Sequence, residues 1–91
     1  MNRVVDLDDL HFTDKEREFN TPLIAHDISK KGVWHISIVL CATENKNVIQ
    51  FRKWFHNMDT DEWSTKSRYT LNSKSQVEGT IQALQDMVEH I

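Results

Sequence analysis

The sequence has few of the features from which enzyme sites are built. With two glycines in 91 residues it has no glycine-rich loop to hold a phosphate group, and it has no Gly-x-Ser-x-Gly or comparable nucleophile motif. Its five histidines and one cysteine show none of the short paired spacings that bring metal ligands together. We therefore expect no catalytic residues, no metal site and no cofactor.

Disulfides and long apolar runs are missing as well. The single cysteine, Cys41, lies within the apolar run at 36–42, so we expect a buried, reduced thiol and no intrachain disulfide. No apolar stretch approaches the roughly 20 residues that cross a bilayer, and residues 1–6 lack the apolar core of a signal peptide. These absences favour a soluble, intracellular protein.

Charge is distributed unevenly along the chain. The net charge of −3 argues against binding to nucleic acid, which needs clustered Lys and Arg. However, residues 30–74 carry eight basic and four acidic side chains, whereas the segments on both sides of them are acidic. The middle of the chain can therefore present a basic surface, although such a surface is also common on proteins that bind no nucleic acid.

Alternating β-branched and aromatic residues predict strands at 33–42, 48–56 and 62–71. The polar stretch 44–47, with two asparagines, suits a hairpin turn, and 57–61 is typical of a loop. A short first strand fits residues 23–29, between the Asn-Thr-Pro breaker and the turn-like Lys-Lys-Gly at 30–32. We expect these four strands to form an antiparallel sheet.

A helix of about 18 residues is predicted to follow the sheet. Ser73 and Gln76 have the spacing of a capping box, in which the serine caps a free N–H and the glutamine reaches back to the cap. Apolar residues then recur at spacings of three and four, as on one helix face: Val77, Ile81, Leu84, Val88 and Ile91. This stripe must cover the sheet, another subunit, or both, and Ile91 at the last position favours a contact between chains.

The expected fold class is therefore α+β, with a curved four-stranded antiparallel sheet followed by a C-terminal amphipathic helix. Residues 22–91 form the expected domain. Residues 1–21 form an expected acidic N-terminal arm, which can hold a short helix. Because opposite charges attract within a Debye length of roughly 10 Å, we hypothesise that this arm folds over the basic surface and competes with its ligand.

Aromatic and basic residues alternate closely in the last two predicted strands. Arg52, Lys53, Trp54 and Phe55 are consecutive, and Trp63, Lys66 and Arg68 follow in the next strand. Single-stranded nucleic acid binders combine aromatic rings that stack on bases with cations that hold the backbone. The same residues could instead be core and rim, since alternation puts Arg52 and Trp54 on one side of the strand and Lys53 and Phe55 on the other, unless a bulge changes the register.

The run Val-Ile-Gln-Phe-Arg-Lys-Trp-Phe at 48–55, the polar loop, Lys-Ser-Arg-Tyr-Thr-Leu-Asn at 66–72 and the helix together resemble the Positive Cofactor Four family of transcriptional coactivators. The resemblance covers about residues 28–91. In it, Arg52 matches a strand arginine of the family and Phe55 a stacking tryptophan, while Lys46 and Lys66 match basic residues. Glu44 stands where the family has a lysine, and Thr43 where it has an aromatic residue.

The resemblance implies a homodimer, with helices at the dimer interface and sheet grooves that hold two antiparallel single DNA strands without reading their sequence. It implies a role in DNA replication, recombination or transcription, with proteins of those processes as further partners. A phage-encoded protein would act in the bacterial cytoplasm and a eukaryotic one in the nucleus.

The residues that we expect to contact DNA are Lys30, Lys31, Trp34, Lys46, Arg52, Lys53, Trp54, Phe55, Trp63, Lys66 and Arg68. Those expected at the dimer interface are Val77, Ile81, Leu84, Val88 and Ile91. The alternative is a protein interaction module that uses the helix stripe and exposed aromatic residues, with the cations incidental.

Overall fold

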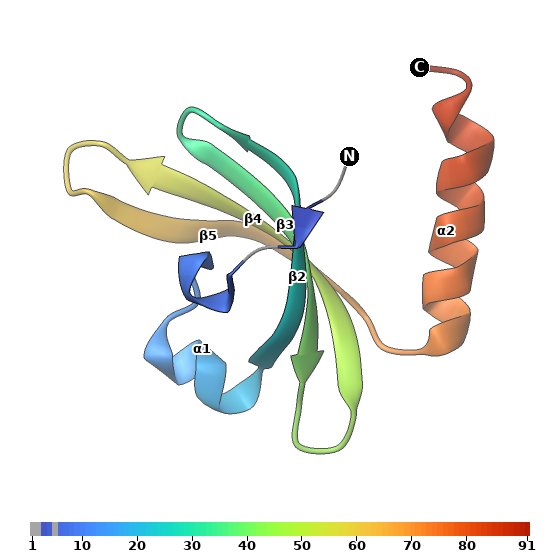
Figure 1. Ribbon diagram of the computed structural model, residues 1–91, viewed down its shortest axis with the longest axis horizontal. Helices are drawn as coiled ribbons and strands as arrows, with labels where there is room; N and C mark the ends of the chain where they lie inside the picture. The colour runs from blue at the N-terminus through green and yellow to red at the C-terminus, as the bar shows by residue number, and fades with distance from the viewer. Residues whose placement is uncertain (1–2, 5) are drawn as a thin grey trace.

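The computed structural model (Figure 1) describes the backbone of residues 3–4 and 6–91, and the side chains from Asp6 onward. Its antiparallel sheet consists, in spatial order, of β1 (Arg3–Val4), β2 (Thr21–Lys31), β3 (Trp34–Ala42), β4 (Asn47–Asn57) and β5 (Glu62–Leu71). A short 3₁₀ helix, η1 (Leu7–Asp9), and helix α1 (Asp14–Phe19) precede β2, and helix α2 (Lys74–Val88) follows β5. The predicted four-stranded antiparallel sheet with a C-terminal helix is confirmed, and the two-residue β1 adds an edge to it.

The second, third and fourth predicted strands agree with β3, β4 and β5 to within one residue, but β2 is longer than predicted. Its pairing with β3 shifts register twice, between Pro22 and Ile24 and between Asp27 and Ser29. Such irregularities break the alternation of apolar and polar residues, which is the pattern that reveals a strand in a sequence. At its end, Lys31 pairs with Trp34, and Gly32 makes the tight turn between them with a φ of +60°.

The core lies between the sheet and residues 6–20, which carry η1 and α1 and which we call the N-terminal segment. Leu10 and Phe12 pack in one cluster with five buried sheet residues: Ala25, Val39, Cys41, Val48 and Trp54. The predicted boundary at residue 21 therefore does not separate two packing units, because the described part of the acidic arm supplies part of the core. Burial raises the pKa of the Cys41 thiol to about 11, which agrees with the predicted buried thiol.

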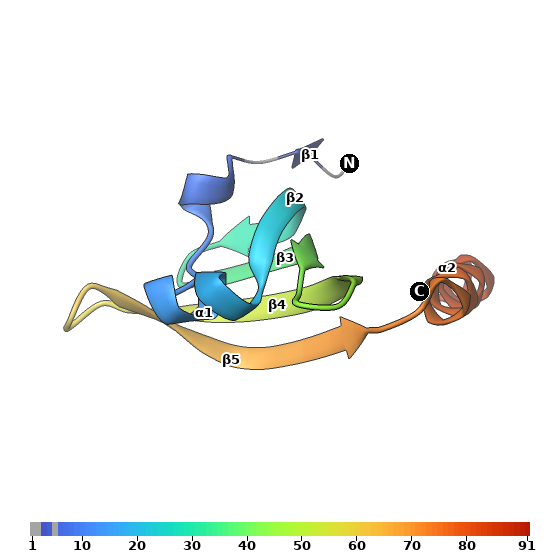
Figure 2. The same ribbon diagram turned by 90° about the horizontal axis from the view of Figure 1, so that it is seen from below.

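Helix α2 begins at the predicted cap but ends three residues before the chain does. Ser73 accepts a hydrogen bond from the Gln76 N–H, whereas the Gln76 side chain reaches one residue further back than predicted, to the Asn72 N–H. Figure 2 shows α2 beside the end of β5, clear of the sheet, and none of its residues is buried. Across the described residues, no helix has the length and apolar character needed to span a membrane.

Candidate nucleic-acid interface

The two faces of the central strands differ sharply in burial. His35, Ser37, Val39 and Cys41 of β3 are buried, and so are the residues of β4 on the same face, Val48, Gln50, Arg52 and Trp54. We call this face, which lies under the N-terminal segment, the covered face. The intervening residues of both strands are half-buried or exposed, and their face is called the open face.

Four of the predicted contact residues meet on the open face: Trp34, Lys53, Phe55 and Lys66, which we call the open-face cluster. Trp34 pairs with Phe55 across β3 and β4, with their ring centroids 5.0 Å apart. The Lys53 ammonium lies 4.7 Å from the centroid of Trp34, and the Lys66 ammonium 5.4 Å from that of Phe55. Each ring thus has a cation beside it, and the Trp34 side chain remains 40% exposed.

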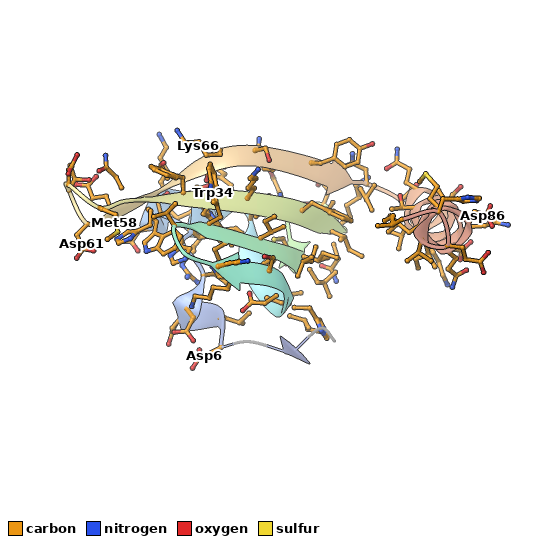
Figure 3. The ribbon with its side chains drawn as sticks, turned by 90° about the horizontal axis from the view of Figure 1, so that it is seen from above. Asp6, Trp34, Met58, Asp61, Lys66 and Asp86 are labelled. Carbon is orange, nitrogen blue, oxygen red and sulfur yellow. The ribbon has the colours of Figure 1, made fainter. Side chains whose placement is uncertain are left out.

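A bulge in β5 brings Lys66 to this cluster. Lys53 pairs with Ser67 and Trp54 with Thr65, so Lys66 is the extra residue between two pairs. Without the bulge, strict alternation from Ser67 would direct Lys66 to the covered face. Figure 3 shows Trp34 and Lys66 close together, with the N-terminal segment and its Asp6 on the opposite side of the molecule.

The surface around the cluster is hollowed. One depression, open to solvent, is lined by Lys31, Trp34, Ile36 and Lys53 among others, and a second is lined by residues that include Ile36, Lys53 and Tyr69. Because Ile36 and Lys53 line both, the two depressions adjoin. The result is a shallow channel across β3, β4 and β5, with the open-face cluster at one side.

Arg52, which we expected to contact DNA, lies on the covered face and is 1% exposed. Its Nη1 donates to Glu16 Oε2 at 2.6 Å and its Nε to Gln50 Oε1 at 2.8 Å, and its guanidinium lies over the ring of Phe12. Arg52 and Phe55, both expected to contact DNA, therefore cannot share one groove in this structure. The pairing of β3 with β4 has no register shift, so residues three apart on β4 must face opposite ways.

The prediction that Trp54 contacts DNA is also wrong for this structure, because its side chain is fully buried against Phe12, His11 and His35. Trp63 lies beside it at the edge of the covered face and is half-buried. Its ring is stacked on both His11, with centroids 3.9 Å apart, and His56, at 4.7 Å. Trp63 is therefore occupied by side chains of the same chain.

The remaining predicted contacts, Lys30, Lys46 and Arg68, are exposed but are not part of the open-face cluster, although Arg68 also lines the depression that Lys53 lines. Lys46 and Arg68 line a depression at the rim of the covered face. Lys30 pairs with His35, and Arg68 pairs with Arg52, which places both on the covered side of their strands. The structure thus divides the predicted residues between two faces.

A polar network beneath the N-terminal segment was not predicted. Asp27 Oδ1 accepts hydrogen bonds from Ser37 Oγ at 2.6 Å and from His35 Nε2 at 2.5 Å, and His35 Nδ1 meets His11 Nε2 at 3.0 Å. Because the carboxylate can only accept, His35 must carry its proton on Nε2 when neutral, and His11 then donates. Burial raises the pKa of Asp27, but the hydrogen bonds from Ser37 and His35 outweigh it, so that its pKa lies below the usual value.

This Ser, His and Asp set does not have the geometry of a catalytic triad. A triad needs the carboxylate on one imidazole nitrogen and the serine on the other, whereas here both meet Nε2 of His35. Ser37 is also fully buried. Within the part of the chain that the structure describes, no three His, Cys, Asp or Glu side chains come together as a metal site.

No family model, curated protein or solved structure matches the chain. Similarity to known proteins therefore adds nothing to the geometry described above. The resemblance to the Positive Cofactor Four family remains an expectation from the sequence.

Helix α2 leaves its apolar residues uncovered. Ile81 and Leu84 are about half exposed, at 50% and 53%, Val88 is more so, and Ile91 beyond the helix is fully exposed, while Val77 is half-buried. An apolar cavity of about 220 Å³ separates the helix from the sheet, lined by Ile38, Ile49, Phe51 and Leu71 on one side and by Val77, Thr80, Ile81 and Leu84 on the other. This region has room for further apolar side chains.

Tyr69 belongs beside the open-face cluster and was left out of the predicted contacts. It pairs with Phe51 across β4 and β5, lines the channel and is 66% exposed. The signal was present in the sequence, since Phe51 shares a strand face with Lys53 and Phe55 and an exposed aromatic partner opposite it extends that face.

Proposed function

We propose that the protein binds single-stranded DNA without reading its sequence, and that the open-face cluster is the contact surface. The observation that carries the proposal is the convergence of Trp34, Lys53, Phe55 and Lys66 from three strands, with a cation beside each ring. The exposed Trp34 ring and the half-buried Phe55 ring suit unpaired bases, whose π-faces are accessible, whereas a duplex keeps its bases stacked on one another.

The magnitudes support a binding surface of moderate strength. Stacking of a base on an aromatic side chain contributes roughly 1–3 kcal/mol, and each phosphate held by a cation adds about 0.7 to the salt slope of single-strand binding. Lys31 at the neighbouring depression and Lys53 and Lys66 in the cluster offer three such cations. These groups contact backbone and base faces, so no sequence preference is expected.

We propose further that the protein is a homodimer joined through α2. The stripe of Val77, Ile81, Leu84, Val88 and Ile91 is uncovered, and the cavity between α2 and the sheet can accept apolar side chains from a second copy. A two-fold contact would bury the same stripe on both copies. The alternative is a protein interaction module, in which the stripe binds a different protein and DNA binding is absent.

The resemblance from the sequence places this activity in DNA replication, recombination or transcription, and the proposed role is that of a binding protein and not of an enzyme. The polar network of Asp27, His35 and Ser37 is assigned a structural role, because it joins β2, β3 and the N-terminal segment in the interior.

The test is fluorescence anisotropy of labelled oligothymidine and of a duplex, at two salt concentrations. Phe55→Ala should weaken binding to the single strand by roughly 5- to 150-fold, and Lys53→Gln should lower the salt slope by about 0.7. Phe19→Ala and Lys74→Gln, which change an exposed ring and an exposed cation outside the open-face cluster, are the matched controls. Equal affinity of Phe55→Ala and Phe19→Ala would refute the assignment, and no binding at low salt would favour the protein interaction module.

A further inference from the structure

The N-terminal segment meets the covered face through the two kinds of group that a nucleotide presents. The His11 ring lies flat on Trp63, with centroids 3.9 Å apart and an angle of 6° between the planes, as a stacked base would. Five residues later, the Glu16 carboxylate receives the Arg52 guanidinium at 2.6 Å, as a phosphate oxygen would. The imidazole ring of His11 thus covers Trp63, and the Glu16 carboxylate pairs with Arg52.

The fit of the segment to Arg52 and Trp54 is incomplete. Among the described residues, the buried side-chain atoms that lack a hydrogen-bond partner are Arg52 Nη2 and Trp54 Nε1, both donors on the same face of β4. Buried donors are normally paired, because an unpaired one loses its hydration without replacement. A phosphodiester group offers more acceptor oxygens than the single Glu16 oxygen that contacts Arg52.

Strands β3, β4 and β5 pair with one another without the segment, although its departure must uncover the core side of the sheet that Leu10 and Phe12 cover. Helix α1 has six residues, which is too short to be stable alone, and none of them is buried. Arg17 donates to the carbonyls of Leu7 and Leu10, so part of the hydrogen bonding of the segment is internal to it. Its contacts with the sheet include the apolar Leu7, Leu10 and Phe12, the polar contacts of His11 and Glu16, and a hydrogen bond that Asn20 accepts from Gln50.

We propose that residues 11–16 occupy in cis a second groove for single-stranded nucleic acid, on the covered face, and that a bound strand displaces them. In this exchange a base replaces His11 on Trp63 and a phosphate replaces Glu16 on Arg52. Lys30, Lys46 and Arg68, which are exposed on the covered side, then line the path of the strand. The segment acts as an internal competitor that lowers the affinity of the resting protein.

This inference rests on the proposed binding of single-stranded DNA but concerns a different face. The first experiment is hydrogen–deuterium exchange of the full chain with and without saturating oligothymidine. The amides of α1 should exchange faster when the strand is bound, since they lose their packing on the sheet. An unchanged rate at α1 under saturating oligothymidine would overturn the inference, and it would leave the open-face assignment standing.

The second experiment compares Glu16→Gln with Glu18→Gln in the anisotropy assay. Glu16→Gln weakens the internal competitor and should tighten binding to oligothymidine by about tenfold, the equivalent of one charge-assisted hydrogen bond. Glu18 lies on the same helix, is exposed and forms no salt bridge with the arginines whose side chains the structure describes, so Glu18→Gln should bind as the unchanged protein does. Equal affinities of the two variants would overturn the inference.

The source of the displacing anion is tested with poly-glutamate. If poly-glutamate speeds exchange at α1 as well as oligothymidine does, the groove accepts acidic peptides and the assignment to nucleic acid is wrong. If Phe55→Ala binds normally while Glu16→Gln binds more tightly, the open-face assignment fails and the covered groove remains. The two proposals therefore fail separately.

Discussion

Acidification should destabilise the protein through His11. Burial holds the pKa of His11 at about 4, below its ordinary value of 6.5, with the charges of His35, Lys30 and His56 acting in the same direction. Between these two values the unfolded chain binds a proton at this site and the folded chain does not. Stability is therefore unaffected above pH 6.5 and is lost as the pH falls toward 4.

The size of the effect follows from the two pKa values. Between pH 7 and pH 5 the two pKa values imply a loss of about 2 kcal/mol in the free energy of unfolding. Because solvent screens this half-buried ring, we expect a loss of about 1–2 kcal/mol. The assay is urea unfolding at both pH values and at one fixed protein concentration, because an oligomer's stability depends on concentration. Asp27 and Glu16, whose pKa values are lowered by hydrogen bonds that outweigh burial, contribute at lower pH.

His11→Gln is the control for this prediction. Glutamine keeps an N–H donor for His35 Nδ1 but cannot take up a proton. The variant should therefore lose about 1–2 kcal/mol less stability than the unchanged protein between pH 7 and pH 5. If the two proteins lose the same stability over this range, His11 is not the group responsible and the reasoning is refuted.

Three further predictions concern stability and assembly. Trp54→Ala should cost about 3–5 kcal/mol in urea unfolding, whereas Trp34→Ala, on the open face, should cost much less, and equal losses would contradict the assignment of the two faces. Ser73→Ala should cost about 1 kcal/mol through the lost helix cap, measured in the same way. Leu84→Glu should convert a dimer to monomers in sedimentation, and an unchanged mass would remove the α2 contact from the proposal.

Local patterns in the sequence were sufficient for most of the sheet and for the start of α2. Strands β3, β4 and β5 follow from alternation, and α2 begins where Ser73 and Gln76 predict. The N-terminal segment was predicted as an arm, because its apolar contribution is three side chains, the buried Leu10 and Phe12 and the half-buried Leu7, in a stretch dominated by charge. These few residues did not reveal a core face in the sequence, because their packing depends on tertiary contacts.

The candidate site could be predicted only in part. Alternation correctly puts Lys53 and Phe55 on one face and Arg52 and Trp54 on the other, but it does not say which face the rest of the chain covers. Arg52 and Phe55 cannot contact DNA on one face, as the resemblance suggested, because β4 continues without a bulge against β3 and the two residues face opposite ways. Conversely, Lys66 reaches the cluster through a bulge in β5 that no residue type in that strand signals.

The stability of α2 links the proposed dimer to the proposed binding surface. A helix of fifteen residues with none of them buried is marginal in water, so the exposed stripe needs an apolar partner for α2 to persist. The cavity that could receive this partner is lined by Ile38, Ile49 and Phe51, which stand on the open face as the cluster does. A second copy docked there would extend the wall of the channel proposed to bind DNA and would place two open-face clusters in one dimer. When one cluster of a dimer has bound a DNA strand, the second cluster meets the same strand at a high effective concentration. The affinity for long DNA strands should therefore depend on dimerisation.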